Sequence, residues 1–148
     1  MTRDNQWLKL RLENIWQKYF PDINLLNNII VKFGLPCRTR LGSIKLGKSS
    51  FLHKIGLNKK ENPNSIITIN GHFKDEKIPE FVVDAVLAHE FTHYAHGFCS
   101  PLKRQYRHPH KGGIVKNEMI DRGLNELLRL EKKWVKLNWV EFLKTKKK

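Results

Sequence analysis

The sequence predicts an α+β fold in which a small mixed sheet packs against an N-terminal helix, a central helix and a long C-terminal helix. Three observations support this prediction. Apolar residues recur at helical spacing near both ends of the chain, short β-branched runs lie between them, and another helical pattern begins near residue 78. Of the 148 residues 40% are hydrophobic, so residues 1–148 are expected to form one domain with a short lysine-rich tail.

The N-terminal half is predicted to contain one helix and then three strands. Residues 7–20 show the periodicity of an amphipathic helix. The runs 28–33 and 65–70 are rich in β-branched residues, and a further strand is expected to begin within 39–44. The short sheet therefore precedes the central helix in the chain.

Two helices are predicted in the C-terminal half. Ile78 to Ala88 reads as a helix start, with Pro79 in the first turn and acidic residues near the N-terminus. The closing helix runs approximately from Ile114 to Leu143, and Gly123 is expected to bend or weaken it. Its apolar residues are expected to pack on the rest of the domain: Met119, Ile120, Leu124, Leu127, Leu128, Leu130, Trp134, Leu137, Trp139, Val140 and Phe142.

The stretch His89-Glu90-Phe91-Thr92-His93 on the central helix indicates a metal site. Residues four apart on a helix share one face, so His89 and His93 can bind the same ion. Glu90 then lies beside the remaining coordination position, where it can act as a general base toward water. The alternative is a helix with two incidental surface histidines, which leaves the glutamate unexplained.

A catalytic zinc site normally has three protein ligands, so a third ligand is expected downstream. His96 follows His93 on the same helix and is expected behind the ligands or at the surface, because three ligands in line cannot surround an ion. Cys99 stands where metzincins place a histidine, but the turn glycine of those enzymes would fall at position 96. Glu118 lies in a segment that resembles the third-ligand helix of gluzincins, and it remains a competitor.

His110 is the preferred third ligand because residues 106–115 form a loop rich in turn residues that can return a side chain to the metal. His108, in the same loop, remains an alternative. Tyr106 or Arg107 is a candidate to stabilise an oxyanion, although nothing in the sequence distinguishes them.

At this point the chain resembles a known family. The run from His89 to Gly123, with H-E-x-x-H and then a P-H-x-G element followed by an apolar residue, is similar to the SprT-like or Spartan metalloprotease domain. The resemblance implies a minimal zincin-like fold, His110 as the third ligand with Ile114 as its apolar anchor, one Zn²⁺ per chain and peptide-bond hydrolysis. This chain departs from the family where Lys111 separates His110 from the glycines, and it has no C-terminal zinc ribbon.

The resemblance also implies where substrates bind. In zincins the edge strand before the motif helix pairs with the substrate backbone, which points to residues 65–70 here. Spartan-type proteases degrade proteins crosslinked to DNA, which implies a DNA-associated or DNA-crosslinked protein substrate.

The formal net charge of +14 biases the partners of this chain toward polyanions such as DNA. Non-sequence-specific phosphate contacts are assigned to the C-terminal lysines Lys132, Lys133, Lys136, Lys146, Lys147 and Lys148. Trp134 and Trp139 lie among them, either as core residues or as faces on which unpaired bases stack. The alternative for the charge is a solvated cationic surface.

The remaining features set the cellular context and the rival functions. Cys37 and Cys99 are expected to be reduced, since two cysteines form no disulfide framework. No run of residues is a secretory signal or long enough to span a bilayer, so a cytoplasmic protein, possible also at the nucleoid or on DNA, is expected without membrane contact. The rivals are a nucleic-acid-binding module with a structural metal, a zinc nuclease or deacylase, and a gluzincin-type peptidase that uses Glu118.

Overall fold

The sheet at the centre of the protein contains both parallel and antiparallel strand pairs. The computed structural model describes residues 2–48, 55–56 and 63–146. Its sheet contains β1 (Ile29–Phe33), β2 (Gly42–Leu46) and β3 (Ser65–Ile69) in the order β1-β3-β2. β3 runs parallel to β1 and antiparallel to β2. The predicted small mixed sheet is confirmed.

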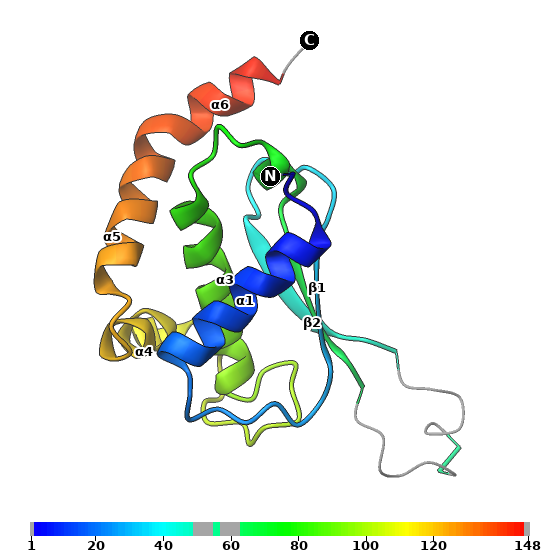
Figure 1. Cartoon of the computed structure of the whole chain (residues 1–148). Helices are drawn as coiled ribbons and strands as arrows, with labels where there is room; N and C mark the ends of the chain where they lie inside the picture. Colours follow the sequence, from blue (N-terminus) through cyan, green and yellow to red (C-terminus); the bar gives the residue numbers. More distant parts are fainter. Residues whose placement is uncertain (1, 49–54, 57–62, 147–148) are drawn as a thin grey trace.

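Two helices cover one face of this sheet. α1 (Asn5–Tyr19) packs on β1, and it crosses in front of α3 (Glu80–Ala95) in Figure 1. The Asp4 side chain caps α1 by accepting a hydrogen bond from the Trp7 backbone N–H at 2.8 Å. One hydrophobic core joins these elements, with Leu8 of α1 and Leu87 of α3 fully buried against the strands. The predicted α+β class and the packing of the N-terminal helix are therefore confirmed.

The assignment of residues 65–70 to the edge of the sheet is wrong. β3 is the central strand, because β1 pairs with one side of it and β2 with the other. Among the described residues, no further strand pairs with β2, which packs against α3 and forms one edge of the sheet. Chain order alone did not predict this arrangement, because the third strand in the sequence lies between the first two.

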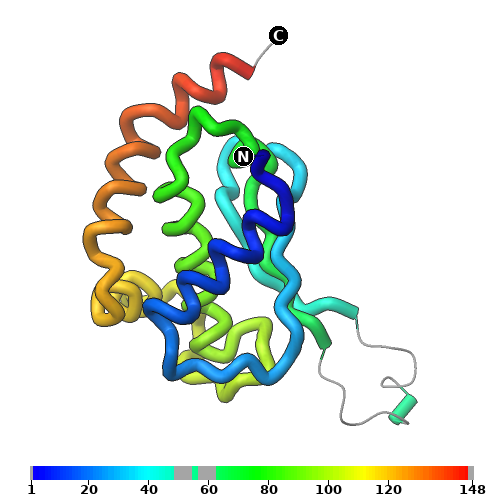
Figure 2. Tube along the Cα trace, in the orientation of Figure 1, coloured from blue at the N-terminus to red at the C-terminus, as the bar shows by residue number. Residues whose placement is uncertain are grey.

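The C-terminal region is two helical segments rather than the single closing helix predicted for residues 114–143. After the short 3₁₀ turn η2 (Lys111–Gly113), α4 (Ile114–Asp121) ends at a chain reversal. α5 (Asn125–Trp134) then continues through one π-helical stretch, η3 (Val135–Trp139), into α6 (Val140–Thr145). Figure 2 shows this second segment rising beside α3.

A Schellman motif explains the reversal. Gly123 has φ +90°, a left-handed conformation that glycine adopts without a steric penalty. The Gly123 N–H donates to the Ile120 carbonyl at 3.0 Å, and the Leu124 N–H donates to the Met119 carbonyl at 2.9 Å. Met119 and Leu124 are both fully buried, which adds the hydrophobic contact that accompanies this motif.

Not all of the apolar residues expected to pack do so. Leu137 and Val140 are each 61% exposed, and Ile120 is also exposed, whereas Trp139 and Phe142 are buried. The Trp139 indole N–H donates to the Arg38 carbonyl at 2.9 Å, and Trp134 is half-buried against the core. Trp139 is thus a core residue with a satisfied donor, which removes it from any base-stacking surface.

Two further sequence expectations concern the cysteines and membranes. Cys37 and Cys99 are both free thiols. Within the described ranges, no helix combines the length and apolar character that crossing a bilayer requires.

The ion pair between Arg11 and Asp84 connects α1 to α3, and its loss is expected to destabilise the fold. The guanidinium donates to both carboxylate oxygens, at 2.6 and 2.7 Å, and each side chain is only 23% exposed. Arg11→Met is expected to lower the free energy of unfolding by about 1–2 kcal/mol, because Asp84 loses a charged, bidentate partner.

Urea denaturation at pH 7 measures this change, and Arg129→Met is the matched control. Arg129 pairs with Glu126 on the surface of α5, with both side chains more than half exposed. The control is expected to unfold at the wild-type midpoint. Equal effects of the two substitutions would show that the α1–α3 bridge adds nothing beyond a surface pair.

Candidate metal centre

Helix α3 places His89 and His93 on one face, one turn apart. Their Nε2 atoms are 3.2 Å apart, and the ring centroids are separated by 4.9 Å. Two nitrogens bound to one tetrahedral zinc ion at about 2.0–2.1 Å lie about 3.3 Å from each other. The two imidazoles therefore already stand at the separation that a shared ion requires.

The chain reverses direction directly after α3 and returns toward these histidines. Gly97 has φ +84°, and a Cβ at this position would lie 2.5 Å from the Lys103 carbonyl oxygen, so only glycine allows this close approach. The Phe98 N–H donates to the His93 carbonyl, and the Gln105 N–H donates to the His96 carbonyl. The glycine at this turn is therefore residue 97, one position after the place where the metzincin pattern has its turn glycine.

His110 completes a group of three imidazoles. One potential ligand atom from each of His89, His93 and His110 lies within 4.8 Å of the other two. The His110 ring centroid is 4.6 Å from that of His93 and 5.8 Å from that of His89. Among the described residues this is the only group of three or more histidine, cysteine or acidic residues with such spacing. The structure therefore brings together the three predicted ligands in a group that can hold a metal ion.

The two alternative third ligands lie elsewhere. His108 is exposed and lines a separate shallow hollow with Tyr106 and Arg107, so neither oxyanion candidate lines the hollow that contains the three histidines. Glu118, on α4, contacts His96 Nε2 at 3.1 Å and Arg122 Nε at 3.4 Å. Its carboxylate contacts these two side chains and is not part of the three-histidine group.

His96 and Cys99 differ in how they relate to this group. His96 is fully buried, which excludes the surface position that was one of its two predicted locations. It connects α3 to α4 through Glu118. Cys99 is half-buried and lines the same hollow as the three histidines, although its thiol is not part of the close group.

Two of the three histidines are in the protonation state that metal binding requires. Burial lowers the pKa of His89 to about 4 and that of His93 to about 4, so both rings are neutral near pH 7. Neutral imidazole is the form that binds metals. His93 Nδ1 is buried and has no hydrogen-bond partner among the described residues, so no protein contact dictates which ring nitrogen carries the proton.

Glu90 is a buried carboxyl group next to the three histidines. It is only 6% exposed, and burial raises its pKa to about 7, an effect that the nearby Arg40 partly opposes. A group with this pKa can both accept and release a proton near neutral pH. A cation held by the three imidazoles would lower the pKa again, because opposite charge favours the ionised carboxylate.

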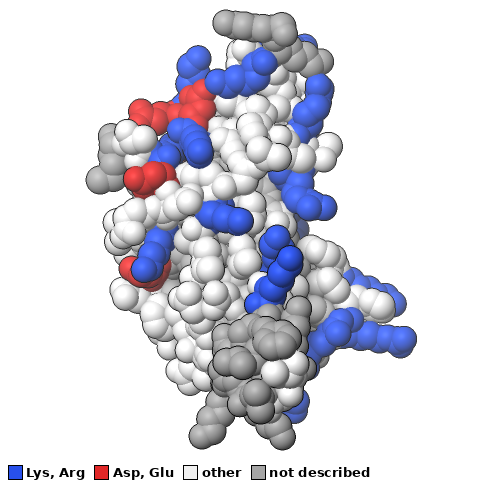
Figure 3. Space-filling model, turned by 90° about the vertical axis from the view of Figure 1, so that its right-hand side faces the viewer, with Lys and Arg blue, Asp and Glu red and all other residues white. Residues whose placement is uncertain are grey.

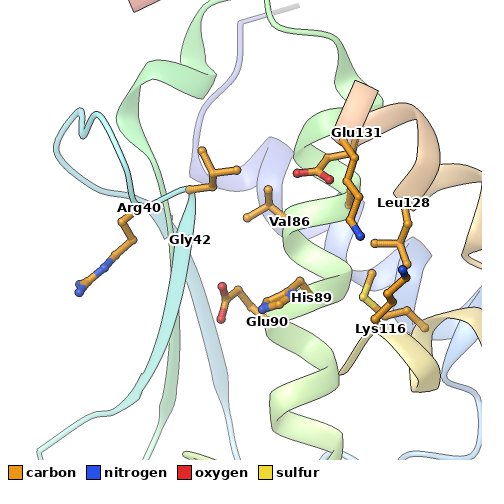
Figure 4. Close-up of a pocket in the computed structure, with 12 residues that line it drawn as sticks. Arg40, Gly42, Val86, His89, Glu90, Lys116, Leu128 and Glu131 are labelled. Carbon is orange, nitrogen blue, oxygen red and sulfur yellow. The ribbon is translucent and has the colours of Figure 1, made fainter. Parts of the chain in front are cut away.

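Two adjoining hollows meet at His89 and Glu90. One, of about 450 Å³, contains the three histidines together with Ser43 and Ile44 of β2. The other, of about 460 Å³, lies between α3, α4 and α5 and is drawn in Figure 4. The predicted metal ligands and the predicted base thus face accessible space rather than a closed core.

Comparison with known proteins identifies no relative of this chain. No family model, no curated protein and no solved structure matches it. The interpretation of the site therefore depends on its geometry and chemistry.

Removing His110 is expected to abolish stoichiometric metal binding, whereas removing His108 is not. Loss of a group that only supports a ligand weakens metal affinity by roughly 10–100-fold, so loss of a ligand should weaken it further. Metal bound per chain, measured by elemental analysis after dialysis, compares wild type, His110→Ala, His108→Ala and Glu118→Ala. Metal loss in His108→Ala or Glu118→Ala, with His110→Ala unaffected, would contradict the geometry.

Gly42 is expected to be essential to the position of Glu90. A Cβ on Gly42 would lie 2.6 Å from Val86 Cγ1 and 3.1 Å from Glu90 Oε1, so Gly42→Ala must displace α3 or β2. We expect a destabilisation of about 1–3 kcal/mol, as is typical of overpacking, measured by urea denaturation. The double variant Gly42→Ala/Val86→Ala should be less unstable than the sum of the two single variants, because the second change makes room. Strict additivity would contradict a steric origin.

Proposed function

We propose that this protein is a zinc-dependent metalloendopeptidase in which His89, His93 and His110 hold one Zn²⁺ ion and Glu90 is the general base. The observation that supports this proposal most directly is the convergence of three imidazoles beside a buried carboxyl group on the same helix. The sequence resemblance to SprT-like proteases rests on the same residues and agrees with this proposal.

The donor set favours zinc in a catalytic rather than a structural role. Imidazole nitrogens suit zinc among the available divalent ions, although copper, iron and nickel also accept them. Structural zinc sites use four protein ligands, whereas catalytic sites use three and leave one position for water or substrate. The close group holds three ligands, and Glu90 next to it is a base that a structural site does not need.

The proposed reaction divides its work between the ion and the protein. When bound, Zn²⁺ acts as a Lewis acid toward the peptide carbonyl and lowers the pKa of water. Glu90 accepts a proton from the attacking water and delivers it to the leaving amine nitrogen, so that one carboxyl group serves both steps. Its position beside His89 lets it reach a water molecule in the hollow that contains the three histidines.

The edge strand β2 is proposed to bind the substrate backbone, in place of residues 65–70. Extended peptides can add to a free sheet edge through main-chain hydrogen bonds. Ser43 and Ile44 of β2 line the hollow that holds the three histidines, so a peptide on this edge would pass the metal-binding group.

The basic surface supports a substrate associated with nucleic acid. Figure 3 shows Lys and Arg side chains spread over the face that it presents, while Asp and Glu side chains gather near its upper left. Lys132, Lys133 and Lys136 are exposed on the α5–η3 segment. Lys146 pairs with Asp75 at 2.7 Å, and Lys147 and Lys148 lie outside the described residues. We propose that phosphate contacts from such lysines bring the protease to DNA-associated or DNA-crosslinked proteins.

Glu90→Gln is expected to abolish proteolysis and leave zinc binding intact. The substitution keeps the shape of the side chain but removes the base. General acid–base catalysis by such a group typically contributes a factor of roughly 10²–10⁴ to the rate. Cleavage of an unfolded protein is measured for wild type and variant at matched zinc content, with and without single-stranded DNA.

The controls separate the rival activities. Intact DNA incubated with the wild-type protein reports a nuclease, and an acylated peptide reports a deacylase. Undiminished proteolysis by Glu90→Gln, or hydrolysis of DNA in place of protein, would overturn the proposed function. Proteolysis that does not respond to DNA would refute only the DNA-associated substrate.

A further inference from the structure

The hollow shown in Figure 4 adjoins the metal-binding hollow but is not used by the proposed chemistry. It has a volume of about 460 Å³ and shares Arg40, Gly42, His89 and Glu90 with its neighbour. A substrate held beside Glu90 would therefore present one of its side chains at this second opening. We refer to this second hollow as the Glu131 pocket, after the residue discussed below.

Most of the wall of the Glu131 pocket is apolar. Val86 comes from α3, Met119 from α4 and Leu128 from α5, and Leu41 precedes β2. These residues form a surface that suits an aliphatic chain, because contact with it removes apolar area from water.

Glu131 places a carboxylate in this apolar wall. Figure 4 shows the Glu131 side chain pointing from α5 toward Val86 on α3. The residue is half-buried, and its side chain makes no hydrogen bond or ion pair with any other described residue. Burial raises the pKa of Glu131, and Lys132, the next residue, only partly opposes this. A desolvated carboxylate without a close partner is costly, and a cation brought to it would offset the cost.

The other charged residues around the pocket are less well placed to interact with a ligand inside it. Arg40, Lys116 and Lys132 are exposed, and long basic side chains line such a surface with their alkyl chains while the charged end reaches water. In Figure 4 the Arg40 side chain extends away from the pocket. Glu126, one helical turn and a half before Glu131 on α5, forms a salt bridge with Arg129 at the surface. Glu131 thus differs from Glu126 in being half-buried and in forming no salt bridge with a described residue.

We infer that the Glu131 pocket binds a lysine or arginine side chain of the protein substrate, with the aliphatic part of that side chain against Val86 and Leu128 and its cation against the Glu131 carboxylate. Glu131 is then a residue that determines cleavage specificity. This role in specificity rests on the proposed peptidase function, whereas the binding of a cationic side chain does not.

A binding experiment tests the pocket without requiring catalysis. Zinc-loaded wild type, Glu131→Gln and Glu126→Gln are titrated with N-acetyl-lysine amide and with N-acetyl-norleucine amide, which has a similar aliphatic chain but no charge. Binding is followed by NMR chemical shifts. We expect wild type and Glu126→Gln to favour the lysine compound by about tenfold, and Glu131→Gln to lose this preference. Glu126→Gln makes the same change in net charge at a site outside the pocket.

The same three proteins are then used to map cleavage in a peptide library that varies the residues around the scissile bond. Glu131→Gln is expected to lower kcat/KM for lysine and arginine peptides by about tenfold and to leave norleucine peptides unchanged. Bound zinc and the thermal midpoint of each variant confirm that the fold is retained.

The outcomes separate this inference from the proposed function. Equal binding of the two blocked amino acids by wild type, a preference for norleucine, or a lysine preference that survives Glu131→Gln would overturn the inference, even if peptides are cleaved. Glu131-dependent lysine binding without any peptide cleavage would support the pocket and refute the peptidase. Cleavage that is equally selective in wild type and Glu131→Gln would refute the role of Glu131 in specificity.

Discussion

The arrangement of this protein depends on the burial of helix α3, which carries polar groups into the interior. Most of its residues are buried, from Val82 to Ala95, and Glu90 and His93 are among them. Removing such groups from water costs free energy unless they find partners or lose their charge. The histidines respond with lowered pKa values and Glu90 with a raised one, so that all three favour their neutral forms in the absence of an ion. An ion shared by the histidines would bind the two Nε2 atoms that lie 3.2 Å apart.

The segment after α3 returns His110 to the histidines of α3 through turns that glycine permits. Gly97 reverses the chain, and Gly112 and Gly113, with φ of +75° and +68°, direct it into α4 immediately after His110. Between these turns, hydrogen bonds from Phe98 and Gln105 attach the loop to the end of α3. An exposed residue, His110, is in this way held next to His89 and His93 on a buried helix.

The reversal at Gly123 has an equally large effect on the surroundings of the site. A straight helix from Ile114 onward would have carried residues 125–143 away from α3. The Schellman motif instead returns α5 along α3, which creates the second hollow and places Glu131 in its wall. The indole of Trp139 then fixes this segment to the Arg38 carbonyl, in the loop that precedes β2. This hydrogen bond connects the C-terminal helical segment to the loop before β2, and both regions contribute residues to the hollow.

The sequence by itself determined the features that depend on neighbouring residues. The spacing of His89 and His93, the position of Glu90 and the start of α3 follow from helical periodicity, and the strands follow from β-branched runs. The turn residues around His110 also indicated that its loop could return to the metal. These signals act over a few residues, so they were visible without any knowledge of tertiary contacts.

The tertiary structure decided what depends on contacts between distant segments. The central position of β3, which leaves β2 at an edge, reflects pairing between residues far apart in sequence. Ile29 pairs with Ser65, 36 residues away, and Gly42 pairs with Ile69. The burial of His96 reflects its contact with Glu118, 22 residues away. Gly123 was seen as a weak point of a helix, but whether it bends the helix or reverses it depends on the burial of Leu124 against the core. Which of His108, His110 and Glu118 lies beside His89 and His93 likewise depends on the path of the chain after α3. Local propensity does not determine this path, because tertiary packing supplies most of the stabilising energy.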